Sequence, residues 1–583
     1  MTAHRSVAIM LAAALAACAH AQIGPDLQPI FEEGFEDADV GALPEGWSVD
    51  FGEDTDVAVS DTPVRGGERS VRIVDSSQEK ATGLRSPKIP IEPDEVYYIS
   101  GWWFGKQGDN CSIYLEFWDA EGTRIDAHSF GCAGTGGWAY RTGSAVAPAD
   151  AVAATMLLYS SSTVLTDGHF DDVSLGIGSP VLYDRTPRPP AQVDHPVGLY
   201  SAADVERANR NIERHEWAKR QLADIINSTE WWMELPDDQI AEWIPEGTPF
   251  RVCNCPACGA QWGVGPWSFL ADGRSKCKRC GTVFPNEDYP ETGTEEHVNP
   301  LGERETITSY VDEAGNRYRL AGLRRYGRIG KLGAAGWLGR AYALTGDVAY
   351  AEKLRKILLR LAEVYPAYIA HDWHRIYRDY NNLQSGKLSG WKLHDAGVFI
   401  ELCLAYDLTV DSGVYSEEDR SLIEEGAFRE AGRLLTTTSP RGCCVNDGPF
   451  LMAAGGYIGK LLGNHDYVAW AIEPPHGFFG FIEENFWRDG HWEDGSPSYE
   501  NMALVKFYVL PEIMQGYSDP ASYTGADRYD DLDLLSNPLL SKVLIAGMHV
   551  TAPDGYQPAN NDSTFAARYS TRHAEENLSL IHI

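Results

Sequence analysis

The sequence is poor in positive charge: 49 Lys and Arg stand against 84 Asp and Glu, which gives its 583 residues a formal net charge of -35. Nucleic acid is therefore excluded as a partner, because phosphate binding needs a basic surface. The same excess of negative charge repels any anionic ligand at long range. A binding site for such a ligand must carry local positive potential.

Long apolar runs are also missing, because after residue 21 no stretch reaches the roughly 20 apolar residues that span a bilayer. The apolar stretch from Val7 to Ala17 and the small residues after it predict an export signal over residues 1–21. Leu15-Ala16-Ala17-Cys18 equally matches a lipobox, in which Cys18 would carry a lipid anchor. We expect an exported protein without a transmembrane span: periplasmic, secreted or an outer-membrane lipoprotein.

The composition, 43% hydrophobic and 23% charged, is that of a globular protein too long for one core. Residues 29–180 carry short apolar runs between turn residues, such as Val96-Tyr97-Tyr98-Ile99, and this texture predicts an all-β sandwich. A Pro-rich linker follows over residues 181–196. Residues 197–583 then switch to a helical period.

Three motifs of the predicted sandwich resemble jelly-roll carbohydrate-binding modules: Gly34-Phe35-Glu36, Pro44-Glu45-Gly46-Trp47 and Phe170-Asp171-Asp172-Val173-Ser174-Leu175. Four tryptophans can stack on sugar rings, with core packing as the other interpretation. They are Trp102, Trp103, Trp118 and Trp138. A disulfide between Cys111 and Cys132 and a calcium ion in the β-sandwich are left open.

The helical region has recognisable caps. Asp347 is placed to cap a helix whose apolar stripe runs from Ala351 to Tyr365, and Ser416 with Asp419 forms a capping box. Further helices are expected at about 329–344, 394–410, 449–463, 467–486 (broken near the prolines at 474–475) and 499–516. Short connections between successive helices predict antiparallel hairpins, and their number predicts a helical array or a closed toroid.

Four cysteines have the spacing of a metal site. Cys255 and Cys258 form one CxxC pair, Cys277 and Cys280 another, and 18 residues separate the pairs. This spacing predicts a four-thiolate zinc site, with disulfides as the alternative, and Cys253 leaves the identity of the first ligand open. Four protein ligands leave no position for water, so the metal would be structural. We interpret residues 251–290 as a zinc-ribbon insertion in the helical domain.

Two segments are candidates for catalysis. Asn446 precedes the helix expected at 449–463, and Tyr499 opens the helix expected at 499–516. Pro449 and Pro497 suit first-turn positions. Because the intervening helical segment should run back, the two helices should be parallel, with both N-termini at the same mouth. Free N–H groups and positive dipole ends at that mouth would give this acidic protein a local anion site.

This arrangement suits the chemistry of a uronate. A carboxylate held there acidifies the neighbouring C5–H, Asn446 can stabilise the enolate-like charge, and Tyr499 can remove the proton and return it to the leaving oxygen. The chemistry demands no organic cofactor. Three sets of residues now resemble the heparinase II/III-like polysaccharide lyases, which include alginate and heparan-type lyases. The sets are Ala341-Tyr342-Ala343-Leu344-Thr345-Gly346-Asp347 with Leu404-Ala405-Tyr406-Asp407-Leu408, Asn446 with the 489–499 segment, and Pro553-Asp554-Gly555.

The resemblance covers about residues 195–570. It implies an (α/α) toroid followed by an antiparallel β-sandwich, with Asn446 as carboxylate neutraliser and Tyr499 as base and acid. There are two departures. Asp447 stands where members often carry His and would repel a uronate unless it is paired or protonated. The C-terminal β-domain is absent from this chain, so we expect the sequence to be a fragment.

Other residues are weaker candidates. His394 is a candidate catalytic residue, although a core His bonded to Asp395 or to the backbone is an equal interpretation. Candidate substrate-binding residues are Trp391, Arg378, Arg441, His491 and Glu493. The sequence as a whole predicts an exported lyase that cleaves an acidic, uronic-acid-containing polysaccharide by β-elimination. The alternatives are a glycoside hydrolase with paired carboxylates such as Asp395 and Glu493, and a non-catalytic glycan-binding surface protein.

Overall fold

The computed structural model describes residues 28–52, 56–106, 110–134, 136–160, 165–178, 188–265, 268–270, 273–372, 376, 385–437, 446–474, 477–561 and 563–564. The chain divides into two compact units, Met1–Asp184 with Thr294–Ile307 and Arg185–Gly293 with Thr308–Ile583. The expected export signal and lipobox Cys18 lie outside the described residues. None of the described helices is both long and apolar enough to cross a membrane.

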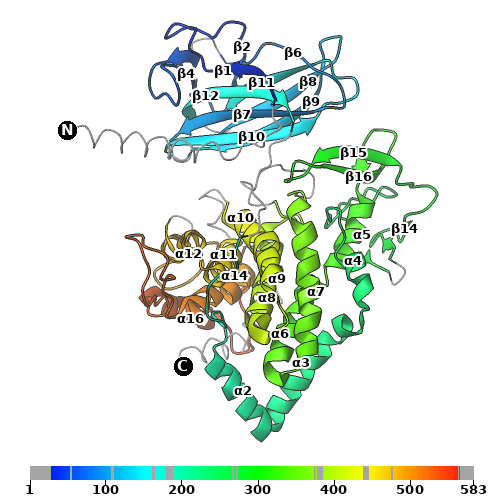
Figure 1. Ribbon diagram of the computed structural model, residues 1–583, viewed down its shortest axis with the longest axis vertical. Helices are drawn as coiled ribbons and strands as arrows, with labels where there is room; N and C mark the ends of the chain where they lie inside the picture. The colour runs from blue at the N-terminus through cyan, green and yellow to red at the C-terminus, as the bar shows by residue number, and fades with distance from the viewer. Residues whose placement is uncertain are drawn as a thin grey trace. The chain divides into compact units, whose positions relative to one another are not determined.

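The first unit is the expected β-sandwich of two six-stranded antiparallel sheets (Figure 1). One sheet has the order β10-β7-β12-β4-β3, with β1 paired to β12; the other has the order β2-β5-β11-β8-β9, with β6 paired to β11. The strands are β1 (Gln28–Glu33), β2 (Ser48–Phe51), β3 (Val57–Ser60), β4 (Ser70–Asp75), β5 (Thr82–Arg85), β6 (Ile89–Pro90), β7 (Val96–Gly105), β8 (Asn110–Trp118), β9 (Arg124–Ala133), β10 (Trp138–Val146), β11 (Ala153–Ser160) and β12 (Thr166–Ile177).

The core of the sandwich accounts for one of the four tryptophans. Trp103 is fully buried and packs against Phe170, with ring centroids 4.8 Å apart. Because side chains alternate along a strand, its neighbour Trp102 faces the other side of the sheet and is half-buried. Cys111 and Cys132 are directly opposite each other in the β8–β9 register, and both are buried. The disulfide between them stays a prediction.

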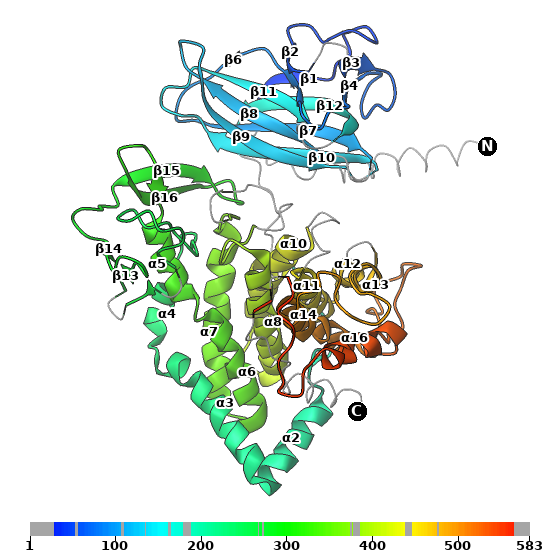
Figure 2. The same cartoon turned by 180° about the vertical axis from the view of Figure 1, so that it is seen from behind.

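The second unit is built mainly of helices, and α6, α7 and α8 pack against one another in it (Figure 2). The helices are α2 (Ala202–Arg214), α3 (Glu216–Glu234), α4 (Ile240–Trp243), α5 (Leu320–Ile329), α6 (Gly336–Thr345), α7 (Val348–Val364), α8 (Lys392–Thr409), α9 (Glu417–Ile423), α10 (Glu430–Thr436), α11 (Gly448–Leu462), α12 (His465–Ile472), α13 (Phe478–Glu484), α14 (Pro497–Phe507), α15 (Val509–Met514) and α16 (Pro538–His549). The short strands of this unit are β13 (Ser275–Lys276), β14 (Val283–Phe284) and β17 (Arg317–Tyr318). All but the first residue of strand β15 (Gly293–Val298) and the first half of β16 (Arg304–Val311) lie in the Thr294–Ile307 segment of the first unit. Closure of the helices into a toroid stays a prediction.

The predicted helix caps agree with the structure, whereas two of the predicted helices are interrupted. Asp347 accepts a hydrogen bond from the backbone of α7, and the capping box of Ser416 is present at α9. The helix expected at 329–344 is instead the end of α5 followed by α6. The helix expected at 499–516 breaks into α14 and α15, because Pro511 cannot donate to the carbonyl of Phe507 and its ring crowds that carbonyl.

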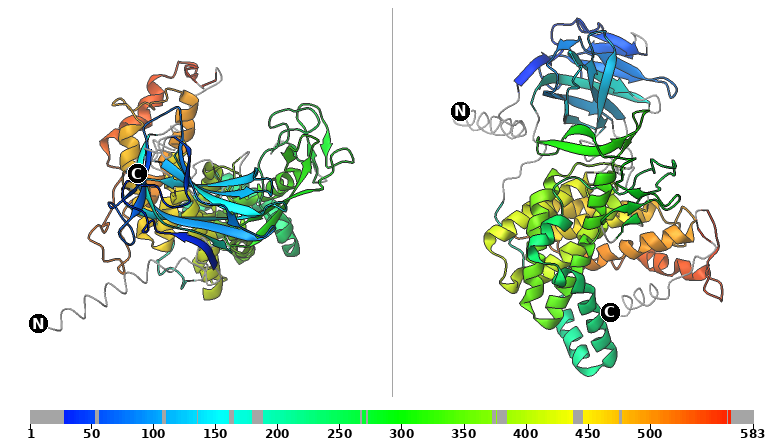
Figure 3. Two further views of the ribbon diagram at one scale, coloured as in Figure 1. Left: turned by 90° about the horizontal axis from the view of Figure 1, so that it is seen from above. Right: turned by 90° about the vertical axis from the view of Figure 1, so that its right-hand side faces the viewer.

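Helix α11 packs against α12, α14 and α15 (Figure 3). An added Cβ at Gly456 would lie 2.6 Å from Leu510 Cδ1 of α15, so the Leu510 side chain packs directly against the α11 backbone there. Lys460, near the end of α11, donates to the carbonyl of Ile513, near the end of α15. The second half of α11 therefore lies alongside α15, with both helices running in the same direction.

Candidate functional site

The ends of four helices meet at one rim of the helical unit. Lys392 Nζ at the start of α8 donates to the Thr437 carbonyl after α10, at 2.8 Å. Trp391 Nε1 donates to Asp447 Oδ2 before α11, at 2.7 Å. Lys387 Nζ donates to the main chain that follows α7 and to the first residue of α10. The C-terminal ends of α7 and α10 and the N-terminal ends of α8 and α11 thus form what we call the rim.

Trp391 and His394 lie together on this rim. Their rings are 5.5 Å apart between centroids and meet edge to face. His394 is half-buried, and burial with the charge of Arg251 lowers the pKa of its imidazole to about 4. Its Nδ1 is shielded from solvent and has no hydrogen-bond partner in the part of the chain that the structure describes. His394 is therefore neutral at neutral pH and able to accept a proton or a hydrogen bond.

Asp395 does not hold His394. Its carboxylate accepts from the backbone N–H groups of Lys387 (2.7 Å) and Leu388 (3.1 Å), and it is completely buried. Burial raises its pKa to about 7, against the effect of these two N–H groups. The carboxylate therefore stabilises the turn that leads into Trp391, which is a structural role.

Asp447 is the residue that departs from the family pattern. It is buried, and burial raises its pKa to about 6 against the lowering effect of the Trp391 indole. Its second oxygen, Oδ1, is buried without a partner among the described residues. Asn446 directly before it is half-buried in the turn that opens α11. Asp447 is thus paired through the Trp391 indole and holds its proton more tightly than an exposed carboxyl group does.

Tyr499 lies in the first turn of α14 and is half-buried. Its hydroxyl makes no hydrogen bond to a residue of the described ranges, and no direct bond joins it to Asn446. Nearby on the chain, His491 Nδ1 lies 3.5 Å from Glu500 Oε2, whereas the side chain of Glu493 is exposed. Pro449 and Pro497 occupy first-turn positions, as expected.

Two further residues near the rim carry no sequence signal. Arg251 interacts with the hydroxyl of Tyr326 on α5, and its charge also acts on His394. Neither residue belongs to a motif, because Arg251 lies 75 residues from Tyr326 and 143 residues from His394 in the sequence. The predicted substrate-binding residues Arg378 and Arg441 lie outside the described residues.

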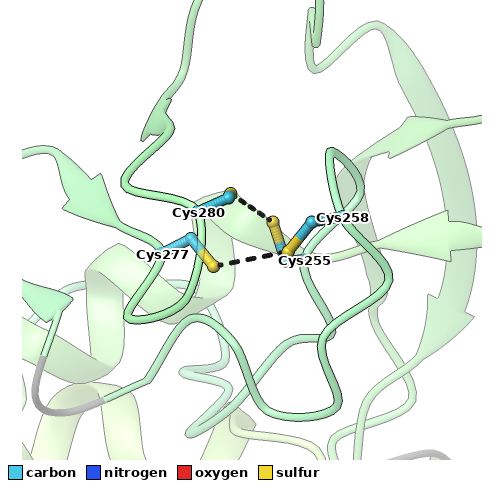
Figure 4. Close-up of side chains that lie close together, drawn as sticks. All are labelled: Cys255, Cys258, Cys277 and Cys280. Carbon is cyan, nitrogen blue, oxygen red and sulfur yellow. Dashed lines mark hydrogen bonds between the residues drawn. The ribbon is translucent and has the colours of Figure 1, made fainter.

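The four cysteines of the two CxxC pairs come together from two loops (Figure 4). All four sulfur atoms lie within 4.8 Å of one another. Cys255 Sγ is 3.7 Å from Cys280 Sγ, and Cys258 Sγ is 3.9 Å from Cys277 Sγ. The edge of a tetrahedron with metal–sulfur distances of about 2.3 Å is about 3.8 Å, so the cluster fits a metal ion.

Residues 251–290, which we call the cysteine module, contain one further cysteine, and it lies apart from the cluster. The thiol of Cys253 donates to the carbonyl of Asn254, at 3.1 Å, and Cys253 is not one of the four clustered residues. This answers the question of the first ligand in favour of Cys255. The separations of 3.7 and 3.9 Å between sulfurs are far longer than a disulfide bond of about 2.05 Å. The arrangement can hold a metal with four protein ligands, which leaves no open position for catalysis.

Comparisons with known proteins give distant relatives. An alginate lyase of Stenotrophomonas maltophilia (strain K279a) is 29% identical over 214 residues, which are 35% of this chain and 26% of the relative. An exo-oligoalginate lyase of Saccharophagus degradans (strain 2-40 / ATCC 43961 / DSM 17024) is 28% identical over 184 residues, 30% of this chain and 24% of the relative. The chain therefore spans about a quarter of the length of the curated relatives it matches. No protein-family model matches it.

Among solved structures, the chain is similar to the CBM22-1 xylan-binding domain from Paenibacillus barcinonensis Xyn10C. The identity is 15% and the TM-score 0.21, with 26% of this chain and 95% of that chain covered. A likeness at this TM-score carries no argument for function. The sequence relatives support a polysaccharide lyase at a coarse level, without deciding the heparinase II/III-like subtype.

Proposed function

We propose that this chain is part of an exported, heparinase II/III-like lyase that cleaves uronic-acid-containing polysaccharide by β-elimination. The distant similarity to two alginate lyases supports the reaction class. The uronic acid, the mechanism and the export go beyond those comparisons. They are proposed from the residues at the rim, from the resemblance of the sequence motifs and from the apolar stretch that begins the chain.

The observation that carries the proposal is the packing of α11 beside α14. Both helices begin with a proline in the first turn, and their C-terminal continuations meet. We infer that their N-termini, with Asn446 and Tyr499, open toward the same side. Two helix N-termini side by side supply N–H groups and positive dipole ends for an anion in a chain of net charge -35.

The proposed reaction follows from these groups. A uronate carboxylate accepts a hydrogen bond from the Asn446 amide, which draws charge from C5. Tyr499, as its phenolate, takes the C5 proton, the C4–O glycosidic bond breaks, and a C4=C5 double bond forms. The tyrosine then gives the proton to the leaving oxygen, so no proton is gained or lost overall. Neutral His394 accepts a hydrogen bond from a sugar hydroxyl in the same pocket.

The hydrolase alternative is less consistent with the geometry. It needs two carboxyl groups that flank one glycosidic bond. Asp395 is completely buried and is engaged by backbone N–H groups, whereas Glu493 is exposed. The first carboxyl group therefore has no access to a polysaccharide.

Glycan binding by the sandwich is a second proposed activity of the chain, and one observation favours it. Trp102 of β7 and Tyr140 of β10 are neighbours on the face of the sheet opposite to core residue Trp103, with ring centroids 5.3 Å apart. Phe104 and Trp138 form a second pair on that face, at 5.6 Å. All four rings are half-buried, and the Arg65 guanidinium covers one face of Trp102, 4.2 Å from the ring centroid, so the other three rings are the ones left for stacking on sugars.

The metal of the cysteine cluster is proposed to be zinc, because four thiolates in tetrahedral array prefer it. The four cysteines would hold it, and it would supply no catalysis. Its task is to fix two loops whose own apolar core is small. Calcium in the sandwich stays a prediction.

The test of the lyase proposal is incubation of the purified chain, and of the full reading frame that contains it, with alginate and with glycosaminoglycans. A lyase creates a conjugated C4=C5 double bond, whose ultraviolet absorbance grows as chains are cut. We expect Tyr499→Phe and Asn446→Ala to abolish this signal. The matched control is Tyr350→Phe, in the first turn of α7 and hence at the end of that helix away from the rim. Reducing ends without the new absorbance would support a hydrolase and reject the lyase.

A further inference from the structure

Arg251 lies on a segment that is held at both sides. The Phe250 N–H donates to the carbonyl of Gly322 on α5, at 2.9 Å, and Cys253 exchanges two backbone hydrogen bonds with Val264 inside the cysteine module. An added Cβ at Gly322 would lie 2.2 Å from the Phe250 ring, so the segment lies tightly on α5. The position of Arg251 is therefore fixed by α5 on one side and by the cysteine module on the other.

The segment that carries Arg251 lies close to the rim, because the ring centroid of Phe250 is 4.4 Å from that of His371, and an added Cβ at Gly390 would lie 3.0 Å from the His371 ring. Arg251 interacts with the hydroxyl of Tyr326, one turn along α5 from the Gly322 contact, and its charge acts on His394. Arg251 forms no ion pair with any residue in the described ranges, although acidic residues are abundant in this chain. Its Nε is shielded from solvent and has no hydrogen-bond partner among those residues. A charged guanidinium left in this state is unusual, because buried donors are normally satisfied.

The acidic groups close to the rim are already engaged. Asp395 accepts from the N–H groups of Lys387 and Leu388, and Asp447 accepts from the indole of Trp391. Arg251 Nε, His394 Nδ1 and Asp447 Oδ1 are among the buried polar atoms that have no partner in the described part of the chain. His394 and Asp447 both contact Trp391, the first through its ring and the second through its carboxylate. Polar atoms that are buried, unpaired and grouped around an aromatic ring are typical of a ligand site.

We propose that Arg251 is a specificity-determining residue whose guanidinium binds a carboxylate of the sugar chain, beside the ring of Trp391. The cysteine module thereby acquires a role in recognition, since it holds the segment that presents Arg251. This inference rests on the proposed function for the identity of the substrate. A planar guanidinium binds a carboxylate through two parallel hydrogen bonds, which a lysine cannot reproduce.

The experiment measures binding in a chain that cannot turn its ligand over. Tyr499→Phe is combined with Arg251→Gln or Arg251→Lys, and calorimetry compares an oligouronate with the same oligosaccharide after reduction of its carboxyl groups. We expect Arg251→Gln to weaken binding of the oligouronate by about tenfold to a hundredfold, with a smaller loss for Arg251→Lys. Binding of the neutral oligosaccharide should be unchanged by either variant.

Arg279→Gln is the matched control, because this arginine is exposed on the second cysteine pair. It should leave both affinities unchanged. Thermal melting and metal content verify that the variants fold, and Arg251→Lys preserves the charge if Arg251→Gln does not fold. Equal weakening of both oligosaccharides would show a structural role and overturn the proposal. Failure of the Tyr499→Phe chain to bind the oligouronate would overturn it as well.

The outcome is separable from that of the lyase test. If binding of the oligouronate depends on Arg251 while the parent chain forms no unsaturated product, the β-elimination proposal fails and the carboxylate site stands. If the parent chain is a lyase and Arg251→Gln leaves both the affinity and KM for the acidic substrate unchanged, only the inference about Arg251 fails.

Discussion

Replacing Asp447 by Asn should stabilise the protein at neutral pH and have a smaller effect in acid. The pKa of Asp447 is raised from 3.8 to about 6 by burial, so the folded state holds this proton more tightly than the unfolded chain does. The stability that this group contributes is therefore present below about pH 4, is lost as the pH rises through about 6, and is missing above that. Asn does not titrate, and its side-chain oxygen can still accept the bond from Trp391.

The magnitude follows from the shift. About two pKa units at about 1.4 kcal/mol each give an upper value of about 3 kcal/mol above about pH 7. At about pH 4.5 the same shift gives roughly 1 kcal/mol, because the wild-type carboxyl group is still mostly protonated in the folded state. The variant should therefore gain up to about 2 kcal/mol on the wild type between the two pH values.

The assay is urea unfolding of the wild type and of Asp447→Asn at about pH 4.5 and about pH 7.5, with the stabilities compared at matched slopes. The control is Asp238→Asn, which makes the same substitution at an exposed residue. If Asp447→Asn raises the free energy of unfolding equally at both pH values, or lowers it at the higher pH, desolvation does not destabilise the buried carboxylate and the reasoning is refuted.

Three other perturbations have expected outcomes. Gly456→Val should drive α11 away from Leu510, lower the free energy of unfolding by about 2 kcal/mol or more and abolish the lyase signal. Gly397→Ala on α8, where an added Cβ meets nothing within 4 Å, should leave both unchanged. Thermal melting and the absorbance assay measure the two effects. Ser416→Ala removes the capping box of α9 and should lower the free energy of unfolding by about 1 kcal/mol in urea, with activity unchanged. Cys277→Ser should abolish stoichiometric zinc in elemental analysis of the purified chain, and retention of one zinc per chain would contradict the four-thiolate site.

The helices that carry strong local signals could be predicted, and the interruptions could not. Asp347 and Ser416 satisfy backbone N–H groups within three residues, so their effect is local and readable in the sequence. The proline at 511 is a signal for the break between α14 and α15, but the expected helix was extended across it because the apolar pattern continues there.

The site divides in the same way. The cysteine spacing limits the possible partners so strongly that the cluster could be predicted, although its first ligand was decided only by the position of Cys253 away from the other sulfurs. Asn446 and Tyr499 could be proposed from motifs at helix starts. The bond from Trp391 to Asp447 and the approach of Arg251 to His394 could not be predicted. The two partners in each pair lie far apart in the sequence, and no rule of spacing connects them.

The sequence by itself determined the sandwich, the run of capped helices, the cysteine cluster and the excess of negative charge. These depend on the period of apolar residues and on short spacings, which act before any tertiary contact forms. The tertiary structure alone decided which charges are neutralised. Burial and partners 56 to 143 residues away in the sequence set the protonation of His394 and Asp447, and the fold leaves Arg251 without an acidic partner among the described residues.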